Sequence, residues 1–174
     1  MNKRKVIIIL IIGLTFSVLA YFSYHIVAKS KEKNKIASKL ETISNFEFRT
    51  LNDLPFTNSN LKTKTPTIFI YFNSECDFCQ HEAESIRKNL ESFKIAQILF
   101  VSIEPIEIIK VFSRHYKLSQ QPNITFLHDN ANTFVTQFDA TSIPYLLIYD
   151  KNQELIKKHK GQLNANGILK ALKE

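Results

Sequence analysis

The chain has 174 residues, with 23 Lys and Arg against 16 Asp and Glu, and a formal charge of +7 at pH 7. It has two cysteines and three glycines, without an internal repeat or a low-complexity tract, which indicates one ordinary globular domain and excludes a disulfide-stapled scaffold. Without the lysines near the N-terminus the chain is close to balanced in charge, so the composition predicts no nucleic-acid partner.

The first long feature is an apolar stretch without formal charge at 6–28, flanked by Lys3-Arg4-Lys5 and by five lysines between residues 29 and 39. At about 1.5 Å per residue, a helix of this length reaches roughly 35 Å, enough for a hydrocarbon core of about 30 Å. We predict an N-terminal transmembrane helix, with residues 1–28 as the membrane anchor. A cleaved signal peptide is the alternative, because Val18-Leu19-Ala20 suits a signal peptidase, although apolar residues continue to Val27.

Residues 29–45 are Lys-rich, with Ile36, Leu40 and Ile43 at helical spacing, which predicts a juxtamembrane stalk ahead of a domain at 46–174. The positive charges on the two sides of the span do not decide its orientation, since long domains translocate largely regardless of charge. The two cysteines of the chain are a candidate thiol pair, and a thiol pair tethered to a membrane is most useful outside the cytosol. We therefore predict a single-pass protein of the bacterial cytoplasmic membrane, with its domain on the periplasmic or extracytoplasmic side.

Apolar runs alternate with stretches of helical spacing through the rest of the chain, which indicates an α/β fold with a mixed central β-sheet flanked by helices. Asp129 is the predicted N-cap of one of these helices. The predicted elements are a short hairpin at 46–48 and 55–56, strands at 67–72, 98–101, 124–127 and 145–149, a returning strand from 155, and helices at 79–93, 105–116, 130–138 and 165–173.

The only two cysteines form the motif Cys76-Asp77-Phe78-Cys79, where a predicted strand hands over to a predicted helix. The first turn of a helix leaves unpaired N–H groups and a positive dipole end, both of which favour an anion. In such a setting the pKa of a cysteine falls from about 8.5 into the range of roughly 3.5–7.5. Cys76 is therefore the predicted nucleophilic thiolate, and Cys79 is the predicted resolving thiol.

An alternative interpretation of this motif is that it forms half of a zinc site, which needs a second pair of ligands. No second cysteine pair exists, and the histidines at 81, 115, 128 and 159 are scattered singly. The sequence therefore predicts no metal site and no cofactor. Two inert buried thiols are a further alternative, which the position of the pair disfavours.

The chain resembles thioredoxin-fold thiol-disulfide oxidoreductases, and among them the membrane-anchored, extracytoplasmic TlpA/ResA type. The resemblance rests on the strand that runs into Cys76 and Cys79, on the segment Ser142-Ile143-Pro144-Tyr145-Leu146-Leu147, and on Glu82, three residues after the second cysteine. It implies that Pro144 has a cis peptide bond and lies opposite the cysteines, where the backbone of Ile143 pairs with an extended substrate.

Glu82 lies one helical turn beyond Cys79, near enough to exchange a proton with the resolving thiol. The alternative for this residue is a solvated carboxylate on the helix surface. The buried acid that thioredoxin carries in the preceding strand is replaced by Ile70, and Glu82 is the candidate to take its role. Glu75 and Asp77 place negative charge beside Cys76, which predicts a thiol pKa higher than in a neutral neighbourhood and hence favours a reductase over an oxidase.

The expected activity is the reduction of disulfides in exported proteins by dithiol exchange, with a membrane or periplasmic thiol carrier as the electron donor. One alternative is a peroxidase of the peroxiredoxin kind, although that site needs Thr or Ser where Asn73 stands. Another is a copper-binding chaperone using the cysteines and His128, although such sites have three residues between the cysteines. A partner-binding module with vestigial cysteines is the third.

Overall fold

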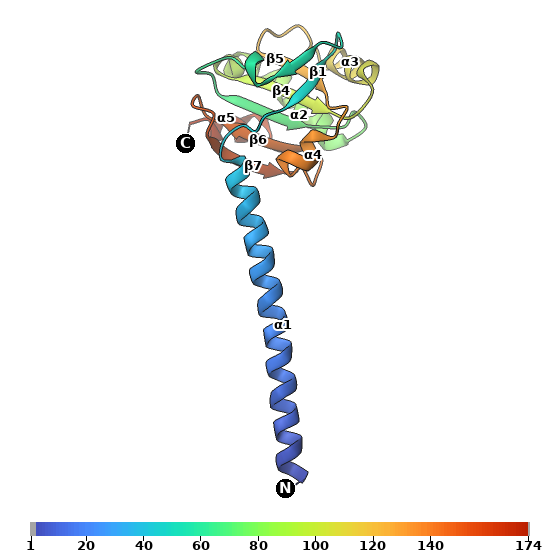
Figure 1. The fold of residues 1–174 in the computed structure, drawn as a ribbon. Coiled ribbons are helices and arrows are strands. Elements are labelled where there is room, and N and C mark those ends of the chain that lie inside the picture. The colour runs from blue at the N-terminus through green and yellow to red at the C-terminus, as the bar shows by residue number, and fades with distance from the viewer. Residues whose placement is uncertain (1–2, 174) are drawn as a thin grey trace. The chain divides into compact units, whose positions relative to one another are not determined.

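The structure is a computed structural model that describes residues 3–173. Met1, Asn2 and Glu174 lie outside the described residues, as do the side chains of residues 3–12, 15, 28, 30–35 and 37. The chain divides into two compact units, Met1–Lys39 and Leu40–Glu174. The first unit belongs to a single continuous helix, α1 (Lys3–Leu40), drawn in blue in Figure 1.

The stretch predicted as a membrane span, 6–28, lies inside α1. Its described large apolar side chains are exposed: Leu14, Phe16, Val18, Leu19, Tyr21, Phe22, Tyr24, Ile26 and Val27. A search over the residues that the structure describes finds no helix that combines the length and the apolar character needed to cross a membrane. Part of the predicted span, including the side chains of residues 6–12, lies outside the described residues.

The second unit contains one seven-stranded sheet in the order β2-β1-β5-β4-β3-β6-β7. The central strands β3, β4 and β5 are parallel, whereas β6 is antiparallel to β3, β7 to β6, and β1 to both β5 and β2. The predicted mixed sheet is thus confirmed. The strands are β1 (Glu47–Thr50), β2 (Pro55–Thr57), β3 (Thr67–Tyr71), β4 (Gln97–Ser102), β5 (Ile124–His128), β6 (Tyr145–Tyr149) and β7 (Leu155–Lys160).

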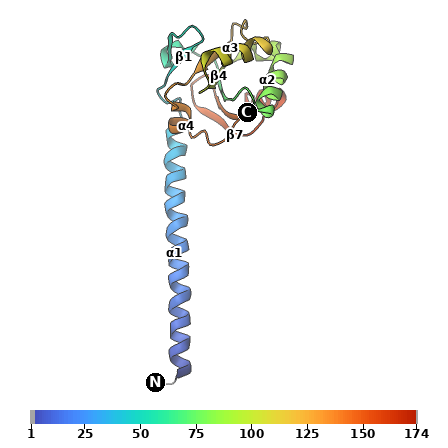
Figure 2. The same cartoon turned by 90° about the vertical axis from the view of Figure 1, so that its right-hand side faces the viewer.

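Helices cover both faces of the sheet, so the central strands β3, β4 and β6 are buried along their whole length. The helices α2 (Asp77–Lys88), α3 (Ile106–His115) and α5 (Ala165–Ala171) pack on the face that carries Ile68, Ile70 and Phe100. The short helix α4 (Thr133–Phe138) lies on the opposite side of the sheet, as Figure 2 shows. The core therefore has two layers, one on each face of the sheet.

The face under α4 is built mainly from aromatic rings. Phe69 of β3 packs against both Phe134 and Phe138 of α4, with ring centroids 5.8 and 5.7 Å away, and Phe46 stacks on Phe48 at 4.7 Å. Offset and tilted ring pairs of this kind add to the free energy gained by burying the rings. The phenylalanines of distant segments therefore hold the β1–β2 hairpin and α4 onto the sheet.

Two predicted helices differ from the structure by three residues or more at one end. The helix predicted at 79–93 is α2 from Asp77 to Lys88, after which Asn89 leaves helical geometry and a 3-10 turn runs from Leu90 to Ile95. The helix predicted at 130–138 begins only at Thr133, because Asn132 adopts a left-handed conformation with φ of 53°. Both differences come from local turn geometry, which the spacing of apolar residues does not indicate.

The compact unit begins earlier than residue 46, the boundary that the sequence predicted. Leu40 and Ile43 have exposed fractions of 1% and 7%, and the N–H of Leu155 donates to the carbonyl of Glu41 at 2.9 Å. Residues 40–45, which we assigned to the stalk, are thus part of the domain. The spacing of Leu40 and Ile43 therefore reflects the packing of these side chains into the domain core rather than a juxtamembrane stalk.

Candidate active site

The cysteine motif lies where β3 ends and α2 begins, as predicted. Cys76 is the N-cap of α2, with extended φ and ψ of −82° and 113°, and Cys79 lies in the first turn, where its N–H donates to the carbonyl of Cys76 at 2.9 Å. A buried strand followed by an amphipathic helix on the sheet places this junction at the carboxyl edge of the parallel strands. Both thiols therefore sit at the positive end of α2.

The two thiols are free and differ in exposure. Cys76 is partly exposed, whereas Cys79 has an exposed fraction of 1%. Burial raises the pKa of Cys79 well above its usual value, and a side-chain hydrogen bond with Cys76 and the negative charges of Cys76 and Glu82 act in the same direction. The pair is thus close together, with one accessible thiol and one that holds its proton. These roles of nucleophile and resolving thiol remain predictions.

Glu82 is fully buried one turn further along α2, so the alternative of a solvated surface carboxylate is wrong. Its Oε1 accepts a hydrogen bond from the N–H of Leu163 at 3.1 Å, and its Oε2 has no partner among the described residues. Burial raises the pKa of Glu82 to about 8. A carboxyl with this pKa exchanges its proton near neutral pH, as the predicted proton-transfer role requires.

The segment before β6 meets the cysteines from the other side. Tyr145 at the start of β6 pairs with Tyr71 at the end of β3, which brings the residues before Tyr145 beside the cysteine motif. The Ile143–Pro144 peptide bond is cis, as the resemblance implied, and the carbonyl oxygen of Ile143 lies 4.0 Å from Cys76 Sγ. The structure therefore brings together the five predicted site residues.

The other residues considered in the sequence analysis lie on the surface, in the sheet core or in a local turn. Glu75, Asp77 and His81 are exposed, and Ile70 is buried in β3. Asn73 accepts a hydrogen bond from the N–H of Glu75 through its side chain, at 2.9 Å. Within residues 3–173, no three His, Cys, Asp or Glu side chains gather closely enough to hold a metal ion.

Sequence reasoning missed Glu104, which reaches the loop before Cys76 from the end of β4. Its carboxylate accepts hydrogen bonds from Ser74 and from Ser102. Only its position after a predicted strand hinted at this role. Parallel neighbouring strands place their carboxyl ends at one edge of a sheet, but the sequence does not reveal that β3 and β4 are neighbours.

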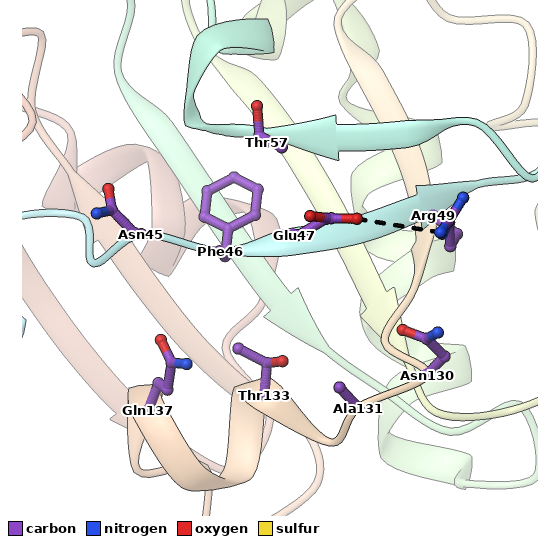
Figure 3. A pocket seen from close by; sticks show the side chains of 9 residues that line it. All are labelled: Asn45, Phe46, Glu47, Arg49, Thr57, Asn130, Ala131, Thr133 and Gln137. Atoms are coloured by element: carbon purple, nitrogen blue, oxygen red, sulfur yellow. Dashed lines mark ion pairs between the residues drawn. The ribbon is translucent and has the colours of Figure 1, made fainter.

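Two hollows lie away from the thiols. A polar hollow of about 510 Å³ opens between the β1–β2 hairpin and the start of α4, where Figure 3 shows Glu47 and Arg49 as an ion pair at 4.0 Å. A more apolar hollow of about 360 Å³ lies between Ser74 and Gln80 on one side and residues of α3, including Val111, on the other. Neither hollow contains a cysteine.

Solved structures with low sequence identity share this fold. A secreted Mycobacterium tuberculosis disulfide oxidoreductase, described as homologous to E. coli DsbE, is 16% identical, with a TM-score of 0.62 over 78% of this chain and 97% of that chain. Peroxidoxin BcpB from the same organism is 17% identical, with a TM-score of 0.65 over 76% and 94%. A thioredoxin-like protein from Aeropyrum pernix is 16% identical, with a TM-score of 0.61 over 84% and 95%.

These likenesses confirm the predicted thioredoxin-like α/β fold. A comparison of the sequence with curated proteins found no match. Residues 40–162, well over half of the chain, match the AhpC/TSA family. The chain therefore belongs to the AhpC/TSA family.

Proposed function

We propose that this protein is a thiol-disulfide oxidoreductase that reduces disulfides of exported proteins by dithiol exchange. One observation carries the proposal: a partly exposed Cys76 caps α2, contacts a buried Cys79 and faces the carbonyl of Ile143. An accessible thiol beside a protected one is what a two-step exchange requires.

In the first step, the Cys76 thiolate attacks one sulfur of a substrate disulfide and forms a mixed disulfide, and the displaced substrate thiolate takes up a proton. In the second step, Cys79 gives up its proton and attacks Cys76 Sγ. This forms the Cys76–Cys79 disulfide and releases the second substrate thiol. Two electrons pass from the pair to the substrate, and an external dithiol carrier, itself oxidised to a disulfide, restores the pair.

Glu82 supports the second step, because Cys79 must lose a proton in a buried setting. With a pKa of about 8, the ionised Glu82 carboxylate is a stronger base than an ordinary carboxylate, and it accepts the proton when Cys79 attacks Cys76 Sγ. We further propose that Ile143 pairs with the extended substrate backbone and that Pro144 shapes this segment. No cofactor takes part in these steps.

We also propose that residues 6–28 anchor the protein in the bacterial cytoplasmic membrane, with the domain on the extracytoplasmic side. The absence of formal charge from this stretch and the exposed apolar side chains of α1 support the anchor. Fractionation of cells, followed by protease treatment of intact spheroplasts, tests this. Release of the protein by carbonate washing, or protection of the domain from protease, would overturn the assignment.

The decisive experiment for the activity is the reduction potential of the Cys76–Cys79 couple in the full-length protein, equilibrated with dithiothreitol or glutathione buffers and followed by thiol alkylation. A potential near or below about −230 mV supports a reductase, whereas a value near about −120 mV indicates an oxidase. If no intramolecular disulfide forms, the exchange mechanism fails and metal binding by the two thiols becomes the leading alternative.

A peroxidase is the second candidate, since a peroxidoxin is among the structures that share the fold and the chain belongs to the AhpC/TSA family. In that reaction the Cys76 thiolate would take an oxygen atom from a peroxide and become a sulfenic acid, with water or an alcohol as the leaving group. Cys79 would then condense with the sulfenic acid, which forms the disulfide and releases water. Consumption of hydrogen peroxide by the reduced protein, at a rate that exceeds its reduction of protein disulfides, would favour this candidate.

A further inference from the structure

The loop that carries Cys76 is held by a carboxylate from a different strand end. This loop, residues 73–76, follows β3, and Glu104 follows the parallel neighbour β4. Glu104 Oε2 accepts a hydrogen bond from the backbone N–H of Ser74 at 2.7 Å, and Oε1 accepts one from the Ser74 hydroxyl at 2.6 Å. Both hydrogen-bond donors of Ser74 are thus committed to one carboxylate.

Glu104 is itself oriented by a residue in the sheet. The hydroxyl of Ser102, which is fully buried, donates to Glu104 Oε2 at 3.1 Å and accepts from the N–H of Glu104 at 3.2 Å. The carbonyl of Ser102 accepts a hydrogen bond at 2.9 Å from the N–H of Asp129, which directly follows β5. The carboxylate therefore projects toward the loop from a rigid base.

The other polar groups of the loop are paired as well. The carbonyl of Ser74 accepts from Gln80 Nε2 of α2 at 2.9 Å, and the N–H of Cys76 donates to the carbonyl of Asn73 at 3.3 Å. Ser74 is consequently tied to the sheet through Glu104 and to α2 through Gln80. The residue two positions before the accessible thiol thus has few alternative conformations.

A simpler explanation would make Glu104 a cap for α3, which begins two residues later. However, in the part of the chain that the structure describes, the hydrogen bonds of the carboxylate go to Ser74 and Ser102. In the first turn of α3, the N–H groups of Ile108 and Ile109 donate to the carbonyl of Pro105. The carboxylate serves the cysteine loop rather than its own helix.

We propose that Glu104 is a positioning residue that holds the loop before Cys76, and with it the accessible thiol, at the N-terminal end of α2. The inference deepens the proposed thiol-disulfide exchange and rests on it for its functional meaning. Without the carboxylate, the N–H and hydroxyl of Ser74 lose their acceptor, the loop samples other conformations, and Cys76 spends less time at the helix end. The helix end then favours the thiolate for less of the time, so Cys76 should react more slowly with an electrophile.

The test compares Glu104→Ala with Glu104→Gln in the full-length protein, in a Cys79→Ser background that leaves one thiol. Gln keeps a carbonyl oxygen for the Ser74 N–H and offers its amide to the Ser74 hydroxyl, but it removes the charge. Glu107→Ala is the matched control, because this exposed glutamate of α3 pairs with Lys110 and does not touch the loop. The readout is the rate of iodoacetamide alkylation as a function of pH.

Glu104→Ala should slow the alkylation of Cys76 about tenfold near neutral pH. Glu104→Gln should rescue the profile, and Glu107→Ala should leave it unchanged. An equal acceleration of alkylation in both Glu104 variants would mean that the carboxylate acts only through its charge, and would overturn the proposal. So would an unchanged profile in Glu104→Ala.

Ser74→Ala is the second variant, needed if Glu104→Ala does not fold. It removes the hydroxyl donor and keeps the N–H, so alkylation should slow less than in Glu104→Ala, and an unchanged rate would contradict the proposal. Alkylation requires no disulfide chemistry. Alkylation that slows as described in a protein whose cysteines never form a disulfide would therefore reject the proposed function and retain the positioning role.

Discussion

At the scale of single residues, Cys76 and Cys79 differ in exposure and in proton affinity, although only two residues separate them. In the proposed exchange, the accessible thiol attacks the substrate sulfur, and the buried thiol, whose pKa is raised, keeps its proton until the second step. This order of events decides which cysteine remains bonded to the substrate when the second step is blocked.

Cys79→Ser should therefore trap a mixed disulfide between Cys76 and a substrate protein, because no resolving thiol remains to release it. Cys76→Ser should trap none, since Cys79 is buried. Non-reducing gels of cells that express each variant, with dithiothreitol-treated samples as the control, check this. Adducts of equal yield in both variants would contradict the assigned order.

Glu82 connects the candidate site to the pH dependence of stability. Burial raises its pKa from 4.5 to about 8, so in this window the folded protein holds a proton that the unfolded chain has released. Stability therefore falls as the pH rises from about 4.5 to about 8, and the loss is complete above the folded-state pKa. A neutral side chain at this position should remove the loss.

Glu82→Gln keeps the acceptor for the N–H of Leu163 and should raise the free energy of unfolding by about 2–4 kcal/mol at pH 9, with little effect near pH 4.5. Urea titrations at several pH values measure the difference. Glu84→Gln is the control of opposite sign: Arg87 lowers the pKa of Glu84 to about 2, so that variant should lose stability at neutral pH and not in acid. The same Glu82→Gln variant should slow release of the mixed disulfide.

At the scale of elements, α4 depends on a buried carboxylate that precedes it. Asp129 accepts hydrogen bonds from the N–H groups of Thr133 and Phe134 at 2.8 and 2.7 Å, so it serves the helix start, although Asn132 is the formal N-cap. The prediction that Asp129 is the N-cap is therefore wrong in position, because Asn132 is the N-cap, although the Asp129 carboxylate accepts hydrogen bonds from the first two N–H groups of α4.

Asp129→Ala should cost about 2–3 kcal/mol, because two N–H groups in a buried setting lose their acceptor. Asp129→Asn should cost less, since one oxygen remains. Thermal unfolding measures both, and Gln137→Ala, an exposed position of the same helix, should be nearly neutral. Equal melting temperatures for Asp129→Ala and the wild type would show that α4 does not need this cap.

At the scale of the whole molecule, the domain boundary lies before Leu40 rather than at Phe46. Leu40 and Ile43 are buried, and Thr42 forms a β-bridge with Glu154. Burial of a Leu or Ile side chain contributes about 1.5–3 kcal/mol to the free energy of unfolding, so residues 40–45 contribute to the stability of the domain.

A fragment of residues 40–174 should consequently unfold at a higher temperature than one of residues 46–174, with a difference in unfolding free energy of about 3 kcal/mol or more. A third fragment, 40–174 with Leu40→Ala, should fall between the two. Differential scanning calorimetry separates these outcomes. Identical transitions for the two fragments would return residues 40–45 to the stalk.

The sequence by itself determined the local features. The apolar runs gave the buried strands within a residue or two, and the cysteine spacing placed a thiol pair at a strand-to-helix junction, because these properties depend on neighbours a few residues apart. Resemblance to a known fold added the cis bond at Pro144, which spacing alone does not indicate.

Only the tertiary structure decided the surroundings of these residues. Glu82 is buried because the chain before α5 covers it, 81 residues further along, and Cys76 faces Ile143 because β6 pairs with β3. Glu104 reaches the cysteine loop because β4 is the parallel neighbour of β3. Desolvation and hydrogen bonding between distant segments set the proton affinities of the site, and these contacts exist only once the sheet order has brought the segments together.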